Sequence, residues 1–259
     1  MPTGFTTPLV HAPISAGAQR YEYRVGLGIS PSAEFDVFHE DFHTFMVSTA
    51  ITNGPVANTP LGNWAGAIID IGATVVANTT ATIGANGVIT LADANVSEGA
   101  AIYTTKSFQL ISGKKFFVEA RIRTDDVTDN AVQFGLSDQT AVTNPEDLWT
   151  TTAANVVAFG LLDGSAYPQM LVDAGNSGTA AQTQTEKLMV ADTWHTLAIG
   201  YDGSKIRGYV DGKRVMTWGS ANSTIPTATA LGLFLGHING DGAGGAVVVV
   251  DYIRAVSER

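Results

Sequence analysis

The feature that most constrains the fold is the stretch from Thr193 to Met216, which reads TWHTLAIGYDGSKIRGYVDGKRVM. Its apolar residues alternate with small or polar ones, which is the period-two signature of a strand with one buried face. Two pairs, Asp202-Gly203 and Asp211-Gly212, interrupt the alternation. Glycine favours tight hairpin turns because it accepts positive φ without a Cβ penalty. The stretch therefore predicts three antiparallel strands, the last over Lys213–Trp218, joined by two turns.

The remaining sequence also favours β-structure. Charged residues make up only 15% of the chain and glycine reaches 28, a composition that favours short strands and many turns over helices. Further strands are expected at Ile68–Ala77, Val88–Leu91, Ala100–Thr104, Phe116–Thr124, Ala131–Ser137, Val156–Leu162, Gln169–Val172, Thr185–Val190, Leu231–His237 and Ala246–Val256. About a dozen strands with hairpin turns between them predict an all-β fold of two packed antiparallel sheets.

Two of these strands carry informative patterns. Phe116–Arg123 alternates cleanly, which places Glu119 and Arg121 on one face and predicts a cross-strand or diagonal ion pair. Val247–Val250 is a continuous apolar run, as expected for a central strand covered on both sides.

The chain divides into three parts. Prolines recur through residues 1–34 and oppose both helix and central strand, yet the segment is too apolar for a solvated tail. We therefore expect an extended N-terminal arm over 1–34, an aromatic connector and loop over 35–63, and the sandwich over 64–259. The arm residues expected to contact a partner are Phe5, Leu9, Val10, Ile14, Tyr21 and Tyr23.

The charge and the cysteine count limit the classes of partner. A net charge of −10 argues against nucleic acid, because phosphate contact needs clustered lysine and arginine. There are no cysteines, hence no disulfides or thiolate metal sites. The N-terminus lacks the basic and apolar regions of a secretory signal, and no run reaches the length of a membrane span. We expect synthesis in a reducing cytoplasm and no membrane partner.

Trp194-His195 ahead of an alternating strand, followed by Tyr209-Val210-Asp211-Gly212-Lys213, resembles the laminin-G-like, concanavalin A-like jelly-roll family. The resemblance implies a jelly-roll sandwich of the kind that serves lectins, adhesion modules, some glycosidases and many phage virion proteins. It also implies that His195 is a structural residue packed at the start of its strand rather than a general base.

The β-glucan hydrolases of that family use a strand with the pattern Glu-x-Asp-x-x-Glu or a close variant, so that alternate carboxylates line a groove as nucleophile and acid. The only similar strand here contains Glu119, and Arg121 stands where the second carboxylate is required. No other expected strand carries two carboxylates on one face. The sequence therefore predicts that the chain is not an enzyme and has no catalytic residue.

An alternative enzymatic interpretation comes from His39, Glu40 and His43, which match H-E-x-x-H. On a helix this spacing places two imidazoles on one Zn²⁺, with the glutamate as general base. No third ligand follows, because Met46 and Thr49 replace the glycine and histidine of the longer motif. We favour an aromatic plug at this position, and expect no metal and no cofactor.

A lectin-like function is a further alternative, because lectins of the family bind sugar through loop aromatics and often through Ca²⁺ held by oxygen ligands. Asp and Asn clusters in turns are more often explained by turn chemistry. The candidate Ca²⁺ ligands are Asp125, Asp126, Asp129 and Asn130 in one loop and Asn239 and Asp241 in another, and the candidate sugar-stacking residues are Trp149 and Tyr167. For His237 and His11 the sequence suggests no partner.

A second resemblance covers residues 35–256. The segments Glu40-Asp41-Phe42, Trp64, Asp70–Ala73, Phe117–Ile122 and Phe134–Asp138 look like tailed-phage virion proteins in which an Asp-Phe motif precedes a laminin-G-like sandwich. This implies a capsid decoration, or cement, protein on the virion surface, in contact with the major capsid protein and with neighbouring copies of itself. By analogy a homotrimer is expected. The alternative is a glycan-binding module of a phage tail or head fibre that recognises a host-surface glycan.

Overall fold

A computed structural model describes 14 segments of the chain. These segments are residues 35–40, 59–61, 64–69, 80–83, 88–93, 95–104, 108–139, 148–149, 155–162, 164–175, 180–184, 186–218, 225–240 and 245–258. Structural statements below refer to them. The N-terminal arm predicted over 1–34, including its six contact residues, lies outside the described residues.

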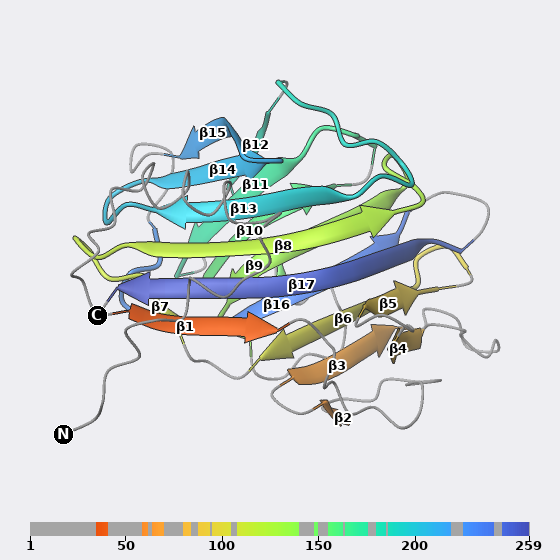
Figure 1. The fold of residues 1–259 in the computed structure, drawn as a ribbon, viewed down its shortest axis with the longest axis horizontal. Coiled ribbons are helices and arrows are strands. Elements are labelled where there is room, and N and C mark those ends of the chain that lie inside the picture. The colour runs from red at the N-terminus through yellow and green to blue at the C-terminus, as the bar shows by residue number, and fades with distance from the viewer. Residues whose placement is uncertain are drawn as a thin grey trace, which may run out of the picture.

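Sheet A, the front layer in Figure 1, is built from eight antiparallel strands, and β17 occupies its centre. β17 pairs with β8 along one edge and with both β5 and β1 along the other. In spatial order the strands are β15 (Lys213–Trp218), β14 (Ile206–Val210), β13 (His195–Tyr201), β8 (Phe116–Thr124), β17 (Val247–Glu258), β5 (Ile89–Ala92) and β4 (Thr80–Ile83), with β1 (Phe35–Glu40) on the later half of β17.

Sheet B lies behind sheet A and is also antiparallel (Figure 1). Its order is β12 (Ala180–Thr183), β11 (Gln169–Ala174), β10 (Asn155–Leu161), β9 (Asn130–Ser137), β16 (Ala230–Asn239), β6 (Gly99–Thr104), β3 (Trp64–Ile69) and β2 (Thr59–Leu61). The short β7 (Phe108–Gln109) also pairs with β16. The predicted all-β, two-sheet antiparallel sandwich is therefore confirmed.

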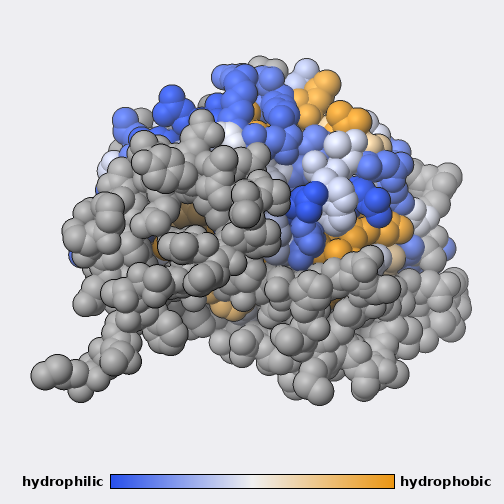
Figure 2. Space-filling view, in the orientation of Figure 1, coloured by the Kyte–Doolittle hydropathy of each residue, from blue (hydrophilic) through white to orange (hydrophobic). Residues whose placement is uncertain are grey.

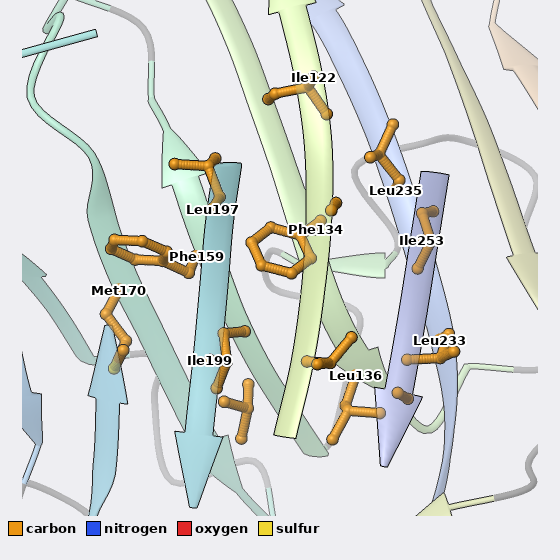
Figure 3. Close-up of a cluster of buried hydrophobic side chains, with 14 of the residues drawn as sticks. Ile122, Phe134, Leu136, Phe159, Met170, Leu197, Ile199, Leu233, Leu235 and Ile253 are labelled. Atoms are coloured by element: carbon orange, nitrogen blue, oxygen red, sulfur yellow. The ribbon is translucent and has the colours of Figure 1, made fainter. Parts of the chain in front are cut away.

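The main core fills the space between the two sheets. Strands of both sheets alternate, so every second side chain points inward and becomes inaccessible to solvent. In Figure 3, Ile122, Leu197, Ile199 and Ile253 come from sheet A, and Phe134, Leu136, Phe159, Met170, Leu233 and Leu235 from sheet B. A second apolar cluster lies on the other face of sheet B, where Trp149 stacks on Phe234 with 5.9 Å between ring centroids.

A β-bulge in β17 reverses which side chains point outward. The register against β8 shifts between Val250 and Tyr252, leaving Asp251 as the extra residue. Before the bulge Val248 and Val250 point into the core, and after it Ile253 and Ala255 do. Since side chains alternate with a period of two, one inserted residue exchanges the faces. Tyr252 and Arg254 consequently reach the outer face of sheet A.

The two ends of the sandwich differ. At one end, named here the arm end, Phe116 pairs with Ser257 and Phe35 with Glu258, so the residues before Phe35 join the sandwich there. At the opposite end, named the loop end, β8 finishes at Thr124 and the connections after β5, β8 and β16 meet. At about 3.3 Å per residue, the length of β8 separates the two ends by roughly 25 Å.

The three-strand prediction for Thr193–Met216 is confirmed. β13 and β14 enclose the Asp202-Gly203 turn, where Gly203 has φ 97°. β14 and β15 enclose Asp211 and Gly212, with φ of 47° and 83°, the pair of positive values that a two-residue type I′ turn requires. Phe116–Thr124 and the apolar central strand at Val247 are confirmed as β8 and the start of β17.

Other boundaries differ from the prediction. The strand expected at Thr185–Val190 is wrong, because β12 ends at Thr183 and residues 186–190 are not in a strand. Residues 35–63, expected as a connector and loop, contribute β1 to sheet A and β2 to sheet B. β1 is anchored by more than backbone pairing, since Phe38 packs edge-to-face on Phe108 at 6.1 Å.

Gly135 of β9 permits a close approach between two neighbouring strands of sheet B. Its φ is 153°, and a Cβ at this position would lie 2.0 Å from the carbonyl oxygen of Val157 on β10. We predict that Gly135→Ala lowers the free energy of unfolding by at least about 3 kcal/mol, because a buried β-pair must separate to admit the methyl group. Urea denaturation measures this. Thr217→Ala, at an exposed position of β15, should change it by less than about 0.5 kcal/mol. Equal effects would contradict the interpretation.

Candidate functional site

The outer face of sheet A carries a row of polar side chains between β8 and β17. Arg254 Nη2 lies 2.5 Å from Glu119 Oε1, and the Tyr252 hydroxyl donates to the same oxygen at 2.9 Å. Arg121 Nη1 lies 2.5 Å from Asp251 Oδ2. Glu119 and Arg121 do lie on one face, as predicted, but each pairs with a residue of β17 rather than with the other. The described surface on this side is mostly hydrophilic (Figure 2).

Towards the loop end, two guanidinium groups lie over one indole ring. The guanidinium carbon of Arg121 is 4.8 Å from the ring centroid of Trp194, and that of Arg123 is 5.4 Å away. The strand register explains this contact. Because His195 of β13 is opposite Ile122 of β8, the preceding residue Trp194 comes opposite Arg123. Trp194 is half-buried, as are both arginines. We name Arg121, Arg123 and Trp194 the Arg–Trp cluster.

The loop end is closed by buried polar side chains between the sheets. Asp93 Oδ1 accepts hydrogen bonds from the Ala246 amide at 2.8 Å and the Asn239 side chain at 3.2 Å. Its Oδ2 lies 3.5 Å from Nδ1 of His237, and that nitrogen is 3.3 Å from Asn130 Oδ1. His237 therefore has partners that the sequence did not suggest, because they come from β9 and from the loop after β5.

The pKa values of this buried pair diverge. Burial raises the pKa of Asp93 from 3.8 to about 7, against the opposing effect of its hydrogen bonds from Ala246 and Asn239, and the nearby Glu98 and Asp125 raise it further. Burial also lowers the pKa of His237 to about 3. His237 is thus neutral at physiological pH, so the 3.5 Å approach to Asp93 is not an ion pair.

The two loops proposed as Ca²⁺ sites do meet at the loop end, where Asn130 pairs with Asn239 in the β9–β16 register. Their side chains, however, serve turn and loop structure. Asp126 Oδ1 accepts from the amides of Thr128 and Asp129, which is an Asx-turn. Asp125 Oδ1 accepts from the Val247 amide. Asp241 lies outside the described residues. No group of three or more metal-ligating side chains occurs in the part of the chain that the structure describes.

His195 is a structural residue, as the resemblance implied. It is buried at the start of β13, and both ring nitrogens are bonded. The Val190 amide donates to Nε2 at 3.0 Å, so Nδ1 holds the proton and donates to Asp211 Oδ2 at 2.9 Å. Burial alone would raise the pKa of Asp211, but hydrogen bonds from His195 and Lys187 lower it to about 2.

The remaining candidates do not form a site among the described residues. Trp149 is buried against Phe234 and is therefore not an exposed sugar-stacking residue, whereas Tyr167 is half-buried. His39 and Glu40 lie in strand β1, not in the helix that a zinc site of the H-E-x-x-H type requires. His43 and His11 lie outside the described residues. Within the same limits, no helix is long and apolar enough to cross a membrane.

The Arg–Trp cluster was missed in the sequence. Trp194 was noticed only as part of a family pattern, and Arg123 only as a member of an alternating strand. A signal did exist, since an aromatic residue one position before β13 and a cation one position from the end of β8 meet once those strands pair. That pairing joins segments about 70 residues apart, which local patterns do not specify.

The two antiparallel sheets and their shared core define a jelly roll of the concanavalin A-like class. The sequence profile of the laminin-G group described as "Concanavalin A-like lectin/glucanases superfamily" matches residues 97–254, more than half of the chain. The chain therefore belongs to this family. No curated protein sequence matches it.

Solved structures share the fold at low identity. The carbohydrate recognition domain of Emp47p is 13% identical with a TM-score of 0.55, covering 80% of this chain and 97% of that domain. A β-glucanase of Bacillus licheniformis is 15% identical with a TM-score of 0.55, covering 85% and 97%. The catalytic domain of a Thermotoga petrophila endo-1,3-β-glucanase (laminarinase) is 14% identical with a TM-score of 0.52, covering 88% and 99%.

These neighbours correct one conclusion from the sequence. The prediction that the chain is not an enzyme is contradicted, because glycoside hydrolases recur among the proteins of the same fold. The prediction relied on one hydrolase strand pattern, and a fold shared by lectins and glucanases does not separate the two classes. At these identities the comparison establishes the fold, and it connects the chain with both carbohydrate-binding and carbohydrate-cleaving proteins.

We predict that Asp93→Asn removes a pH dependence of stability. A carboxyl group whose pKa is raised in the folded state favours folding while it is protonated. Its contribution to the free energy of unfolding is therefore full below pH 4 and is lost as pH rises towards 7. Above pH 7 the variant should be more stable than the wild type by up to about 4 kcal/mol. Denaturation from pH 4 to 8 measures the difference, with the exposed Asp192→Asn as control. Parallel curves for wild type and Asp93→Asn would refute the assignment.

The buried pair Glu119–Arg254 gives a second prediction. Glu119→Gln leaves a buried guanidinium without its counter-charge and should lower the free energy of unfolding by about 3–5 kcal/mol. The matched control is Glu186→Gln. Glu186 pairs with Lys213 at 2.9 Å, and both side chains are more than half exposed. This control should lower the free energy of unfolding by less than about 1 kcal/mol. Urea denaturation measures both losses. Similar losses in the two variants would contradict the prediction that burial of the ion pair determines the size of the effect.

Proposed function

We propose that this chain is a capsid decoration protein of a tailed phage, which binds the major capsid protein through its N-terminal arm and its sandwich. The observation that carries the proposal is the pairing of β1 with β17. This pairing runs from Phe35 opposite Glu258 to Glu40 opposite Ile253, and it fixes Phe35, the first residue after the proposed arm, at the arm end. The resemblance of residues 35–256 to phage virion proteins supports the same assignment.

An arm attached in this way is suited to span a seam between subunits. Strand pairing and the contact of Phe38 with Phe108 hold residue 35 on the sandwich, so the residues ahead of it start from a defined point. Burying one large apolar side chain of the arm contributes about 1.5–3 kcal/mol. Ordering a proline-rich segment opposes this, and several anchors are therefore required. Phe5, Leu9, Val10, Ile14, Tyr21 and Tyr23 are the proposed anchors.

The negative net charge of the chain is compatible with a position on the outer surface of a capsid. With a net charge of −10, decorated particles repel one another at neutral pH. We further propose contact between neighbouring copies on the shell, with a homotrimer as the assembly expected by analogy.

The arm is tested in the full-length chain. Changing Phe5, Leu9 and Ile14 together to serine should weaken binding to purified capsids by at least about a hundredfold, because three apolar anchors are lost. The matched control changes Thr3, Thr6 and Thr7 to serine in the same arm and should bind like the wild type. Sedimentation of the protein with capsids measures occupancy. If the serine variant decorates capsids as fully as the control, arm-mediated attachment is wrong.

A second candidate, glycan binding, is favoured by a separate observation. The fold is shared with a carbohydrate recognition domain and with several glucanases, and the Arg–Trp cluster offers an aromatic ring beside hydrogen-bond donors on the outer face of sheet A. On this proposal the sandwich recognises a host-surface glycan from a phage head or tail. A glycan array with and without Ca²⁺ tests it, and silence on the whole array would count against it.

A further inference from the structure

We propose that the Arg–Trp cluster binds a carboxylate-bearing glycan, with Arg123 as the residue that pairs with the carboxylate. The inference deepens the glycan-binding function proposed above and rests on it. It assigns a ligand class and a place on the molecule, namely the outer face of sheet A at the loop end.

Arg123 is the member of the cluster that remains available for a ligand. Arg121 is neutralised by Asp251 at 2.5 Å, and Arg254 of the same face by Glu119. For Arg123, by contrast, no carboxylate of the described residues lies within ion-pair distance, and its guanidinium lies over the ring of Trp194. A half-buried guanidinium with no counter-charge among the described residues is suited to bind an external anion.

The contact with Trp194 orders this guanidinium without using its hydrogen-bonding capacity. A guanidinium attracted to the face of an indole keeps its N–H donors for a planar anion. A carboxylate matches that fork with two parallel hydrogen bonds. Arg121 also lies over the Trp194 ring, and its ion pair with Asp251 holds it there. The indole is therefore fixed before a ligand arrives, which reduces the entropy cost of binding.

The surroundings favour a sugar acid over a simple ion. Trp194 is only half-buried, so part of its ring remains open to solvent beside the guanidinium. An aromatic surface packs against the apolar face of a sugar ring, and the exposed Thr193 immediately precedes Trp194 in the chain. A chain of net charge −10 repels a polyanion in general, so a specific unpaired cation is needed to bind one.

The position of the cluster is compatible with a protein that is attached elsewhere. Arg123 lies seven residues along β8 from Phe116, which at about 3.3 Å per residue is roughly 23 Å from the arm end. A ligand at the loop end and a capsid at the arm end can therefore be bound together.

The test compares two ligands that differ only in whether their carboxyl groups are free or methyl-esterified. Calorimetric titration of the full chain with an oligogalacturonate should show binding that weakens with salt, and the fully methyl-esterified oligosaccharide should bind at least about tenfold more weakly. Arg123→Gln should weaken oligogalacturonate binding about tenfold or more, and Arg123→Lys less. The matched control is Arg214→Gln, an exposed arginine on β15 that has no described ion pair, and it should bind as the wild type does.

Each result decides between distinct accounts. Equal binding of acid and ester, unaffected by Arg123→Gln, would overturn this inference and leave glycan binding in place. If neither oligosaccharide binds and a glycan array is also silent, the proposed glycan-binding function falls together with the inference. Equal binding of a polyglutamate peptide and the oligogalacturonate would overturn the glycan assignment and indicate an acidic protein partner.

Discussion

The pairing of β17 is the constraint on which the rest of the structure depends. This strand lies between β8 on one edge and both β5 and β1 on the other, so it joins the start of the described chain to its end. The bulge at Asp251 then determines which side chains of β17 point into the core and which point outward. If the residues of β17 alternated regularly through Asp251, with no bulge, Tyr252 and Arg254 would point into the core, and Glu119 would lack its two partners. One inserted residue thus sets the whole polar row on sheet A.

Under the proposed function, the same strand connects two ends of the molecule that have different roles. At the arm end β17 finishes beside Phe35, the first residue after the predicted N-terminal arm. At the loop end β17 starts beside Thr124, near the buried Asp93–His237 pair and the Arg–Trp cluster. A rigid double-sheet scaffold between the ends allows attachment at one and recognition at the other. This division reconciles the proposed virion role with a fold that is shared with carbohydrate-binding proteins.

Local pattern was sufficient for much of the fold. The Asp-Gly turns after Tyr201 and Val210 and the alternation of Phe116–Thr124 are properties of adjacent residues, and the structure confirms both. The strand at Thr185–Val190 failed because alternation alone does not ensure a pairing partner. β1 was missed because its strand depends on β17, more than 200 residues away. The partners of His237 and the Arg–Trp cluster could not be predicted for the same reason. The register between two distant strands does not follow from the sequence of either strand alone.

Electron cryomicroscopy of the phage capsids proposed above to carry this chain tests the central claim most directly. The account predicts sandwich-sized density on the capsid surface, with Phe35 and Glu258 towards the shell and Trp194 directed away from it. Density with the Trp194 end buried against the shell, or particles that lack the protein altogether, would contradict the proposal that the arm attaches one end and leaves the other free to bind.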